Sequence, residues 1–399
     1  MQKPLFDEMA SVPVRLRPER AKKAANGFVS SVWSFPEQGA PSIYRWYGTL
    51  PLGLVERLLS LYAPIGSERI LDPFLGSGMT LEAASKAGNG GLGLDCNPLS
   101  CLLAEAKIFS SHRLDELHKE CTTILSNESK KPLRFGRMLE YASKPRFDYT
   151  RKWFREDTLE ATLRLLAAIA AVKNESLQRQ LFVVAAQVVR EVASVDPRCT
   201  HHLVTKQKPF LSPYERLRQK VALIERDGST GVTANIRIEQ GSILTASISQ
   251  HFDFGIIHPP YLGVIHYHQI HRLATDLLAI AAEVGMAATL RRYDWTYDVT
   301  KAADFSTDDS AKYSASVAAL ANRSATLFEK GARCAVIIGD QRHKGFLRHP
   351  FTDFITHFEA SGFTLEENFI WLLQNNGGMH VLRRGHFIDH NYILIFQRR

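Results

Sequence analysis

The feature that most constrains the fold is an alternation of short apolar segments with helical ones, interrupted once. Apolar runs at 69–72 and 91–95 predict buried strands, and 79–87 and 98–107 predict the helices that follow them. Strands that alternate with helices of this length are typical of a parallel sheet covered by helices. The sequence therefore predicts an α/β protein.

The interruption is a long stretch with helical periodicity and no convincing strand. It runs from 114 to 224 and is clearest at 158–172 and 177–195. Five further strands are expected at 236–238, 252–257, 334–338, 369–373 and 392–396. We therefore expect seven strands with a helical insertion after the second. The last two should pair as an antiparallel ribbon at the sheet edge, because the segment between them has no helical period.

These patterns divide the chain into three parts. Residues 1–40 are expected to be an irregular, basic N-terminal arm. Residues 41–112 and 233–399 together are expected to form one catalytic domain, and 113–232 a helical insertion that is a candidate DNA-binding region.

Composition narrows the class of protein without deciding its function. Of 399 residues 45% are hydrophobic, and 49 Lys and Arg against 41 Asp and Glu give a formal charge of +8. That charge fits either a polyanionic partner or ordinary solubility. The five cysteines form no CxxC pair, and no apolar run is long enough for a membrane span. We expect a cytoplasmic protein without disulfides or membrane contact.

A glycine-containing turn follows the first predicted strand. Asp72 begins the sequence Asp-Pro-Phe-Leu-Gly-Ser-Gly, which ends at Gly78 where a helix is expected. No Lys follows the glycines, and Leu81 stands where a dinucleotide motif has its third glycine. Asp95 ends the second strand, where a carboxylate can accept hydrogen bonds from ribose hydroxyls. Either feature alone fits a tight turn with a helix cap, but together they favour a nucleoside cofactor.

A second turn ends the strand at 252–257. It reads His258-Pro259-Pro260-Tyr261. Two prolines fix the backbone and remove two donors, which leaves carbonyl oxygens as rigid acceptors. An imidazole, a carbonyl and an aromatic ring suit a planar base with an exocyclic amino group. A strand terminator is the simpler interpretation of the prolines alone.

Asp-Pro-Phe-x-Gly-Ser-Gly with a later x-Pro-Pro-Tyr resembles the AdoMet-dependent DNA methyltransferases that modify cytosine N4 or adenine N6. The segment 44–51 resembles the family's segment that closes over the methionine end of the cofactor, and 190–194 resembles a helix end in their insertions. Tyr267 and His271 also fall at matching positions. The resemblance covers residues 41–397 and implies a Rossmann-like seven-stranded methyltransferase sheet.

The resemblance implies roles for individual residues. The base, flipped out of the helix, would be held by the catalytic residues His258, Pro259, Pro260 and Tyr261. The cofactor S-adenosyl-L-methionine (AdoMet) would be bound by Tyr44, Tyr47, Asp72, Phe74, Gly76, Gly78, Asp95 and Ser242.

Two positions depart from the family pattern. His258 stands where the family usually has Asp, Asn or Ser, and only a neutral imidazole can accept a hydrogen bond. Activity is therefore expected to fall below the pKa of His258, with a change in rate between pH 5.5 and 8. Ser242 stands where the family often has an acid that faces the adenine amino group of AdoMet, so cofactor affinity is expected to be lower.

Three segments are candidates for nucleic-acid contact, and the sequence does not choose between them. The first segment contains Lys206, Lys208, Arg216, Arg218 and Lys220. The second contains Arg291 and Arg292, and the third is 374–384. An ordinary solvated face is the alternative for the first. His258, His266, His268 and His271 lie close in sequence but lack metal-ligand spacing, so no metal is expected.

The sequence thus predicts a DNA methyltransferase, with cytosine N4 slightly favoured because a neutral histidine is closer to Ser than to a carboxylate. DNA is the expected partner, with a restriction or defence protein as a further one. An RNA methyltransferase of the tRNA guanine-N2 type is one alternative. A nucleic-acid-binding protein that keeps the fold without turnover is another. The target sequence and oligomeric state are not predicted.

Overall fold

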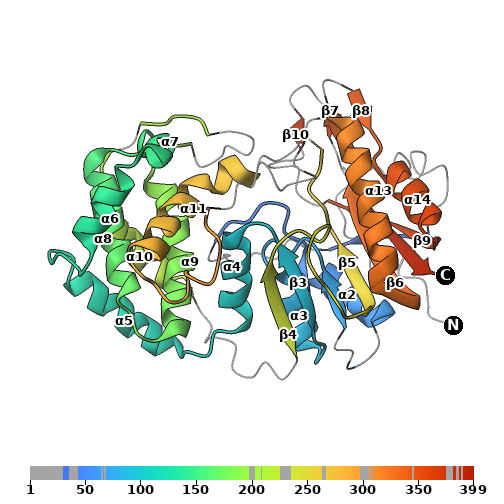
Figure 1. Cartoon of the computed structure of the whole chain (residues 1–399), viewed down its shortest axis with the longest axis horizontal. Helices are drawn as coiled ribbons and strands as arrows, with labels where there is room; N and C mark the ends of the chain where they lie inside the picture. Colours follow the sequence, from blue (N-terminus) through green and yellow to red (C-terminus); the bar gives the residue numbers. More distant parts are fainter. Residues whose placement is uncertain are drawn as a thin grey trace.

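The computed structural model has a central eight-stranded sheet with a mainly helical region at one end (Figure 1). It describes residues 30–35, 44–63, 66, 69–196, 203–207, 209–224, 235–262, 267–296, 305, 307, 309–343, 346–373, 381–382, 386–387 and 390–399. No helix among these residues is both long enough and apolar enough to cross a membrane.

The strands of the main sheet and of two small hairpins are β1 (Ser31–Ser34), β2 (Ile70–Asp72), β3 (Gly91–Asp95), β4 (Ile236–Gln240), β5 (Phe252–Ile257), β6 (Phe328–Gly339), β7 (Gln341–His343), β8 (Phe346–Arg348), β9 (Phe363–Leu372), β10 (Val381–Leu382), β11 (His386–Phe387) and β12 (His390–Arg398). The helices are α2 (Leu52–Tyr62), α3 (Met79–Lys86), α4 (Pro98–Ile108), α5 (Leu114–Ser126), α6 (Phe135–Ala142), η2 (Pro145–Phe147), α7 (Asp148–Arg151), α8 (Glu156–Ala170), α9 (Glu175–Val192), α10 (Pro213–Val221), α11 (Tyr267–Glu283), α13 (Ser310–Leu327) and α14 (Phe351–Ala360).

The strand order confirms the α/β, Rossmann-like class. The main sheet runs β1-β9-β12-β6-β5-β2-β3-β4, so the chain reverses direction across the sheet between β2 and β5. Every pair is parallel except those of β12, which lies antiparallel between β6 and β9. All seven predicted strands are present, and the last two pair antiparallel as expected.

Two strand predictions are wrong at one edge of the sheet. Residues 1–40 were expected to be irregular, but Ser31–Ser34 forms β1 and pairs with β9. The main sheet therefore has eight strands, and the β9–β12 ribbon is not at its edge. The short run Ser-Val-Trp-Ser is held by its neighbour, since Trp33 stacks on Phe369 with ring centroids 4.2 Å apart. Two flanking serines hide this signal in the sequence.

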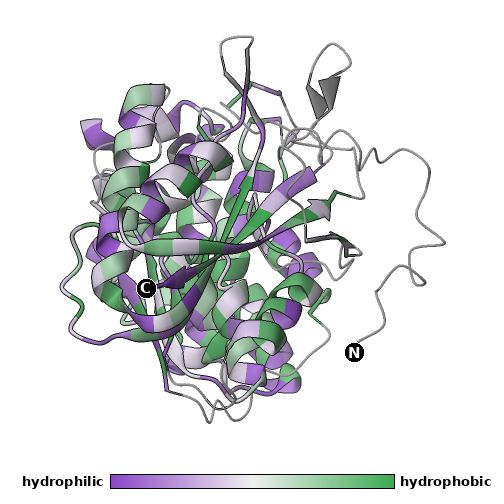
Figure 2. Ribbon diagram, turned by 90° about the vertical axis from the view of Figure 1, so that its right-hand side faces the viewer, coloured by the Kyte–Doolittle hydropathy of each residue, from purple (hydrophilic) through white to green (hydrophobic). Residues whose placement is uncertain are grey.

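Helices cover both faces of the sheet, so the central parts of most of its strands are apolar (Figure 2). Along β12, Tyr392 and Leu394 belong to the core beneath α13 and α14. Ile393 and Ile395, which point the opposite way, belong to the core beneath α2 and α3. This two-sided burial explains why the strands appear in the sequence as continuous apolar runs.

The helical region has a core of its own. Residues of α5, α6, α8, α9 and α10 pack together, joined by α4 before them and α11 after β5. Helix α11 belongs in sequence to the predicted catalytic domain, yet it packs on α6, α7, α8 and α9. The boundaries 41–112, 113–232 and 233–399 stay a prediction.

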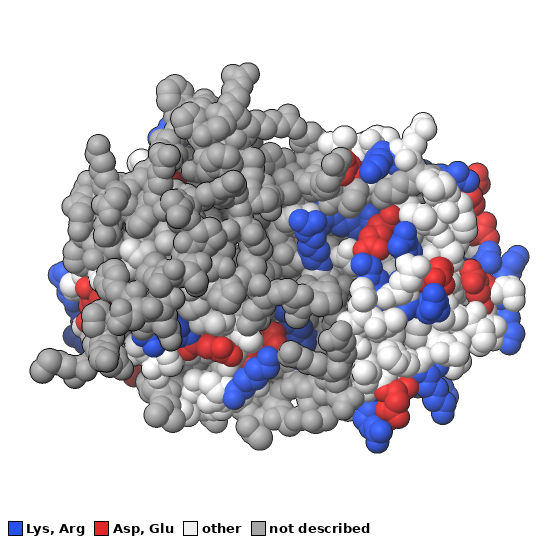
Figure 3. All heavy atoms as spheres, turned by 180° about the vertical axis from the view of Figure 1, so that it is seen from behind, with Lys and Arg blue, Asp and Glu red and all other residues white. Residues whose placement is uncertain are grey.

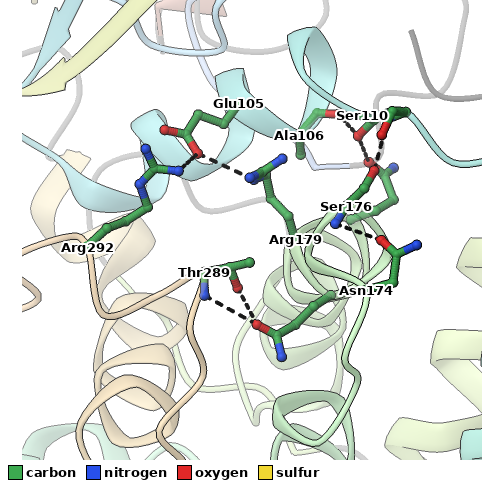
Figure 4. Close-up of polar contacts among 11 residues, drawn as sticks. Glu105, Ala106, Ser110, Asn174, Ser176, Arg179, Thr289 and Arg292 are labelled. Carbon is green, nitrogen blue, oxygen red and sulfur yellow. Dashed lines mark hydrogen bonds and ion pairs between the residues drawn. The ribbon is translucent and has the colours of Figure 1, made fainter. Parts of the chain in front are cut away.

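A buried carboxylate anchors this region to the rest of the chain (Figure 4). Glu105 of α4 is 2% exposed and forms ion pairs with Arg179 of α9, at 3.3 Å, and with Arg292, at 3.0 Å. Nearby, Gln178 accepts from the Thr289 hydroxyl at 2.7 Å. Three separate segments therefore meet at paired charges and hydrogen bonds.

Replacing Glu105 by Ala should lower the free energy of unfolding by about 3–5 kcal/mol, because Arg179 would stay buried without its carboxylate. Denaturant titration measures this. Glu140→Ala, at an exposed position of α6, is the control and should change stability by less than about 0.5 kcal/mol. Equal unfolding midpoints for the two variants would contradict this role of Glu105.

Candidate cofactor and base-binding site

Two neighbouring strands bring the two sequence motifs together. Strand β2 pairs with β5 in parallel, with Ile70 opposite Phe254 and Leu71 opposite Gly255. Both strands therefore end at the same sheet edge, about 4.8 Å apart. The glycine turn begins at Asp72, and the His-Pro-Pro-Tyr turn begins at His258, directly after these strands.

Asp95 organises the glycine turn. Its carboxylate accepts from the Gly76 and Asn97 amides, at 2.9 and 2.8 Å, and from the Ser100 hydroxyl at 2.8 Å. Burial nevertheless raises the pKa of Asp95, while these three donors lower it. Asp95, which was predicted to bind the ribose hydroxyls, thus stabilises the glycine turn in this structure. Any hydrogen bonds to a ribose would use the remaining lone pairs of its carboxylate.

The two glycines are required by the protein's own packing. Gly76 and Gly78 have φ of +51° and +76°. A Cβ on Gly76 would lie 2.9 Å from Nε1 of Trp46, and one on Gly78 would lie 2.6 Å from Cβ of Ala104. We expected the glycines to admit a ligand, but close contact with a tryptophan and with α4 is the reason visible in the structure.

Asp72 is the second carboxylate of the turn. It is 4% exposed and accepts from the Phe74 amide at 3.1 Å. Burial raises the pKa of Asp72 to about 7, against the lowering effect of its hydrogen bonds with Thr80 and Phe74. A carboxylate that titrates near neutrality, buried at a sheet edge, is a candidate for contact with a cation.

An aromatic cluster lies against the glycine turn. The ring of Trp46 stacks on His271 at 4.3 Å and more loosely on Tyr267 at 6.2 Å. Oη of Tyr44 and Nδ1 of His271 are 2.6 Å apart. The Tyr47 hydroxyl accepts from Arg190 at 2.7 Å. Segment 44–50, α9 and the start of α11 thus converge here.

Nε2 of His271 is a buried polar atom in this cluster without a partner among the described residues. Burial raises the pKa of Tyr44 and lowers that of His271, so the hydroxyl keeps its proton and the imidazole is neutral. Tyr44 therefore donates to Nδ1, and the proton of His271 lies on Nε2. Within the described chain Nε2 has no hydrogen-bond partner, although His271 is 1% exposed. A donor buried in this way needs an acceptor.

The second turn is held by two other elements and by a contact within the turn. Tyr313 of α13 donates to the Pro260 carbonyl at 3.0 Å. Tyr261 donates to Oδ1 of Asn391 at 3.2 Å, and His258 Nε2 lies 3.2 Å from the Tyr261 hydroxyl. The Pro260 carbonyl is thus engaged, which leaves the Pro259 carbonyl as the acceptor expected from the sequence.

Burial lowers the pKa of His258 to about 4. The side chain is therefore neutral at physiological pH and can accept a hydrogen bond. The expected change in rate between pH 5.5 and 8 is wrong for this pKa, because the sequence does not show the surroundings of the ring. The fall in activity is expected below about pH 5 instead.

Some of the remaining predicted residues are already bonded within the protein, and others are not. Ser242 follows β4, and its hydroxyl accepts from the Leu244 amide at 3.2 Å. Arg218 pairs with Glu215 at 2.6 Å, Lys220 with Glu191 at 2.6 Å, and Arg292 with Glu105. Lys206, Arg216 and Arg291 are exposed or partly exposed. Lys208, His266, the side chain of His268 and most of 374–384 lie outside the described residues.

Sequence reasoning missed Asn391, Gly339 and Tyr313. Gly339 ends β6 opposite Asn391, and a Cβ there would lie 2.2 Å from Asn391 Oδ1 and 3.1 Å from the Tyr261 ring. A glycine followed by Asp340 at a strand's carboxyl end was the available signal. No signal in the sequence pointed to Asn391 or Tyr313, because their contact with the turn depends on strand order and helix packing.

Part of the chain is similar in sequence to a known methyltransferase. The chain matches no known family model. It is 31% identical over 125 residues to the type II methyltransferase M.MjaII of Methanocaldococcus jannaschii, a match that spans 31% of this chain and 23% of that protein.

Likenesses among solved structures are remote. A TehB-like SAM-dependent methyltransferase from Corynebacterium glutamicum is 12% identical with a TM-score of 0.32, over 86% of this chain and 87% of its own. TrmN from Thermus thermophilus is 11% identical with a TM-score of 0.33, over 88% and 50%. The fold class is assigned from the strand order of the main sheet.

The packing of Gly78 predicts a specific pattern of stability. Gly78→Ala should destabilise by about 2–4 kcal/mol, since strain at positive φ adds to the collision with Ala104. Gly88 has the same φ of +76° with no atom near its Cβ, so Gly88→Ala should cost about 1 kcal/mol.

A double-mutant cycle identifies the collision. Ala104→Gly should cost less in the Gly78→Ala protein than in the wild type, by about 1 kcal/mol or more. Denaturant titration of the four proteins measures the difference. Additive changes would show that Ala104 is not the obstacle.

Proposed function

We propose that this protein is an AdoMet-dependent methyltransferase that modifies the exocyclic amino group of a flipped DNA base, with cytosine N4 favoured slightly over adenine N6. The observation that carries the proposal is the adjacency of the two turns after β2 and β5. A nucleoside-binding turn and a turn with rigid acceptors beside an aromatic ring suit one reaction between a cofactor and a base. The partial match to a type II methyltransferase supports the same class.

The residues around the glycine turn fit AdoMet. The unpartnered Nε2 of His271 would donate to a carboxylate oxygen at the methionine end, and Asp95 would accept from ribose hydroxyls. Asp72, when ionised, would favour a cation nearby. Ser242, after β4, remains a weak candidate for the adenine amino group. AdoMet, when bound, supplies a methyl group on a positively charged sulfur.

At the second turn the chain holds the base and its amino group. The ring would stack on Tyr261, while the Pro259 carbonyl and His258 accept the two amino hydrogens. Acceptors on both hydrogens favour a tetrahedral nitrogen whose lone pair is free to react. A neutral His258, which follows from its low pKa, resembles Ser more than a carboxylate and so supports cytosine.

Asn391 sets which nitrogen of His258 accepts. The single hydroxyl proton of Tyr261 goes to Asn391 Oδ1, so His258 Nε2 carries its own proton and donates to the Tyr261 oxygen. Nδ1 is then unprotonated and is the acceptor for the base. Asn391 therefore acts as a positioning residue through Tyr261.

The proposal predicts methyl transfer from tritiated AdoMet to duplex or single-stranded DNA but not to tRNA. Asn391→Leu should lower kcat on the order of tenfold to a hundredfold, because Tyr261 could then donate to His258 and remove its free acceptor. AdoMet affinity should stay unchanged in this variant, as titration calorimetry would show.

Three other results are distinguishable. Transfer to tRNA alone would favour the RNA alternative and refute DNA. AdoMet binding without transfer to any of the three substrates would favour the member without turnover. Wild-type kcat in Asn391→Leu would remove the role assigned to Asn391 while leaving the enzyme class intact.

AdoMet binding should depend on pH through Asp72. With a pKa of about 7, Asp72 gains negative charge between pH 6 and 8 and should tighten binding of the sulfonium by up to about tenfold. Asp72→Asn should remove this dependence and leave only the ligand's own titration, which both proteins share. Parallel affinity profiles for the two proteins would show that Asp72 does not face the cation.

A further inference from the structure

The helical region carries a basic and aromatic segment that the sequence analysis did not single out. Residues 130–155 hold nine Lys and Arg against two Asp and Glu, a net +7 in a chain of net +8. Six aromatic residues alternate with these charges. Basic side chains among aromatic ones are typical of surfaces that bind nucleic acid.

Two lysines of this segment rest on aromatic rings and are exposed. Lys144 Nζ lies 3.8 Å from the centroid of Tyr141, and Lys152 Nζ lies 4.4 Å from that of Tyr149. Among the described residues neither lysine forms an ion pair with a carboxylate, whereas three arginines of the same segment do. These are Arg146 with Glu283, Arg151 with Asp148 and Arg155 with Asp157. The rings hold the ammonium groups in place without neutralising them, so both charges stay available to an anion.

The contrast with α10 decides between two basic segments. In α10, which belongs to the first candidate segment of the sequence, Arg218 and Lys220 are paired with Glu215 and Glu191. A phosphate there would have to displace an existing partner. No such exchange is needed at Lys144 or Lys152.

Helix α7 lies beside the helix that leads away from the base-binding turn. Arg272 of α11 lies over the Tyr149 ring at 4.1 Å, and Thr150 donates to Asp276. Arg272 is five residues from Tyr267, where α11 begins, which is roughly 7.5 Å along the helix. In Figure 1, α7 is on the same upper side as β7 and β8, which follow the carboxyl end of β6.

A third lysine joins the same surface from a distant part of the chain. The Ser194 amide donates to the Trp153 carbonyl at 2.6 Å, and the Lys206 amide donates to the Ser194 carbonyl at 3.0 Å. The backbone next to Lys152 is therefore separated from that of Lys206 by one residue. Lys206 is exposed.

Seen from behind relative to Figure 1, the described part of the helical region carries mixed charges. Figure 3 shows basic and acidic side chains interspersed there. A mixed surface of this kind is typical of an ordinary solvated face.

We propose that Lys144, Lys152 and Lys206, with the rings of Tyr149 and Trp153, form an α7 surface that binds the phosphate backbone of DNA beside the target base. The proposal rests on the proposed function. Phosphate contacts fix the register of a protein on DNA without reading its sequence, which is the role this surface fits. It would hold the duplex while the base enters the His-Pro-Pro-Tyr turn.

The test replaces Lys144, Lys152 and Lys206 together by Ala and measures binding of a labelled duplex by fluorescence anisotropy over a range of salt. Affinity should fall by at least about tenfold. The slope of log affinity against log salt should become shallower by roughly 2 to 3, since each lost phosphate contact removes about 0.9. Calorimetry with AdoMet should show unchanged binding, which verifies that the variant is folded.

A second triple variant is the control. Lys119, Lys173 and Lys330 are exposed and lie outside residues 130–155, and Lys173 lies just before α9, at the end opposite Ser194. Replacing these three by Ala removes the same net charge. Duplex affinity should stay within about twofold of the wild type, with the same salt slope.

The outcomes separate the surface from the function. Equal affinity and salt slope in both triple variants, with methyl transfer to DNA intact in the wild type, would overturn the surface and keep the enzyme class. Equal losses in the two variants would also overturn it, because net charge alone would explain them. In another case the wild type binds DNA without methylating it, and the α7 variant loses duplex binding. That pair of results would support the surface and refute the activity. Wild-type protein that binds no duplex would overturn the surface, and it would overturn the function as well if single-stranded DNA were not methylated either.

Discussion

Parallel pairing of β2 with β5 is the constraint on which the site depends. These strands are adjacent in space but separated in sequence by the whole helical region. Because both end at the same edge, the turn at Asp72 and the turn at His258 are neighbours. The proposed transfer from a cofactor at one turn to a base at the other rests on this adjacency.

The helical region contributes to that edge and is not an independent appendage. Arg190 of α9 donates to the Tyr47 hydroxyl, and Gln187 of the same helix accepts from the Arg45 amide at 3.1 Å. Glu105 fixes α9 from the other side through Arg179. The segment against the glycine turn is thus supported by the same helix whose end, at Ser194, contacts Trp153 of the α7 surface.

Much of this fold could be predicted from the sequence. Seven strands, the position of the helical interruption and the antiparallel final pair follow from apolar runs and their spacing, which report burial directly. Strand β1 could not, because four residues with flanking serines carry too little pattern. Its stability comes from β9 and from the stacking of Trp33 on Phe369.

The motifs of the site could be predicted from the sequence, but the residues that contact and position them could not. Asp72 and His258 stand in recognisable turns, but their pKa values depend on burial that only the packed structure shows. Asn391 reaches Tyr261 because β12 pairs with β6, a pairing of distant segments. The unpaired charges beside α7 were likewise hidden, since the sequence does not show which lysines meet a carboxylate.

The identity of the methylated nucleoside tests the account most directly. DNA treated with the protein and AdoMet would be digested to nucleosides and examined by mass spectrometry against authentic standards. The account predicts N4-methylcytosine, with N6-methyladenine as the other product of the same chemistry. Methyl groups on carbon 5 of cytosine would contradict it, because that reaction needs a covalent nucleophile and not acceptors around an amino group.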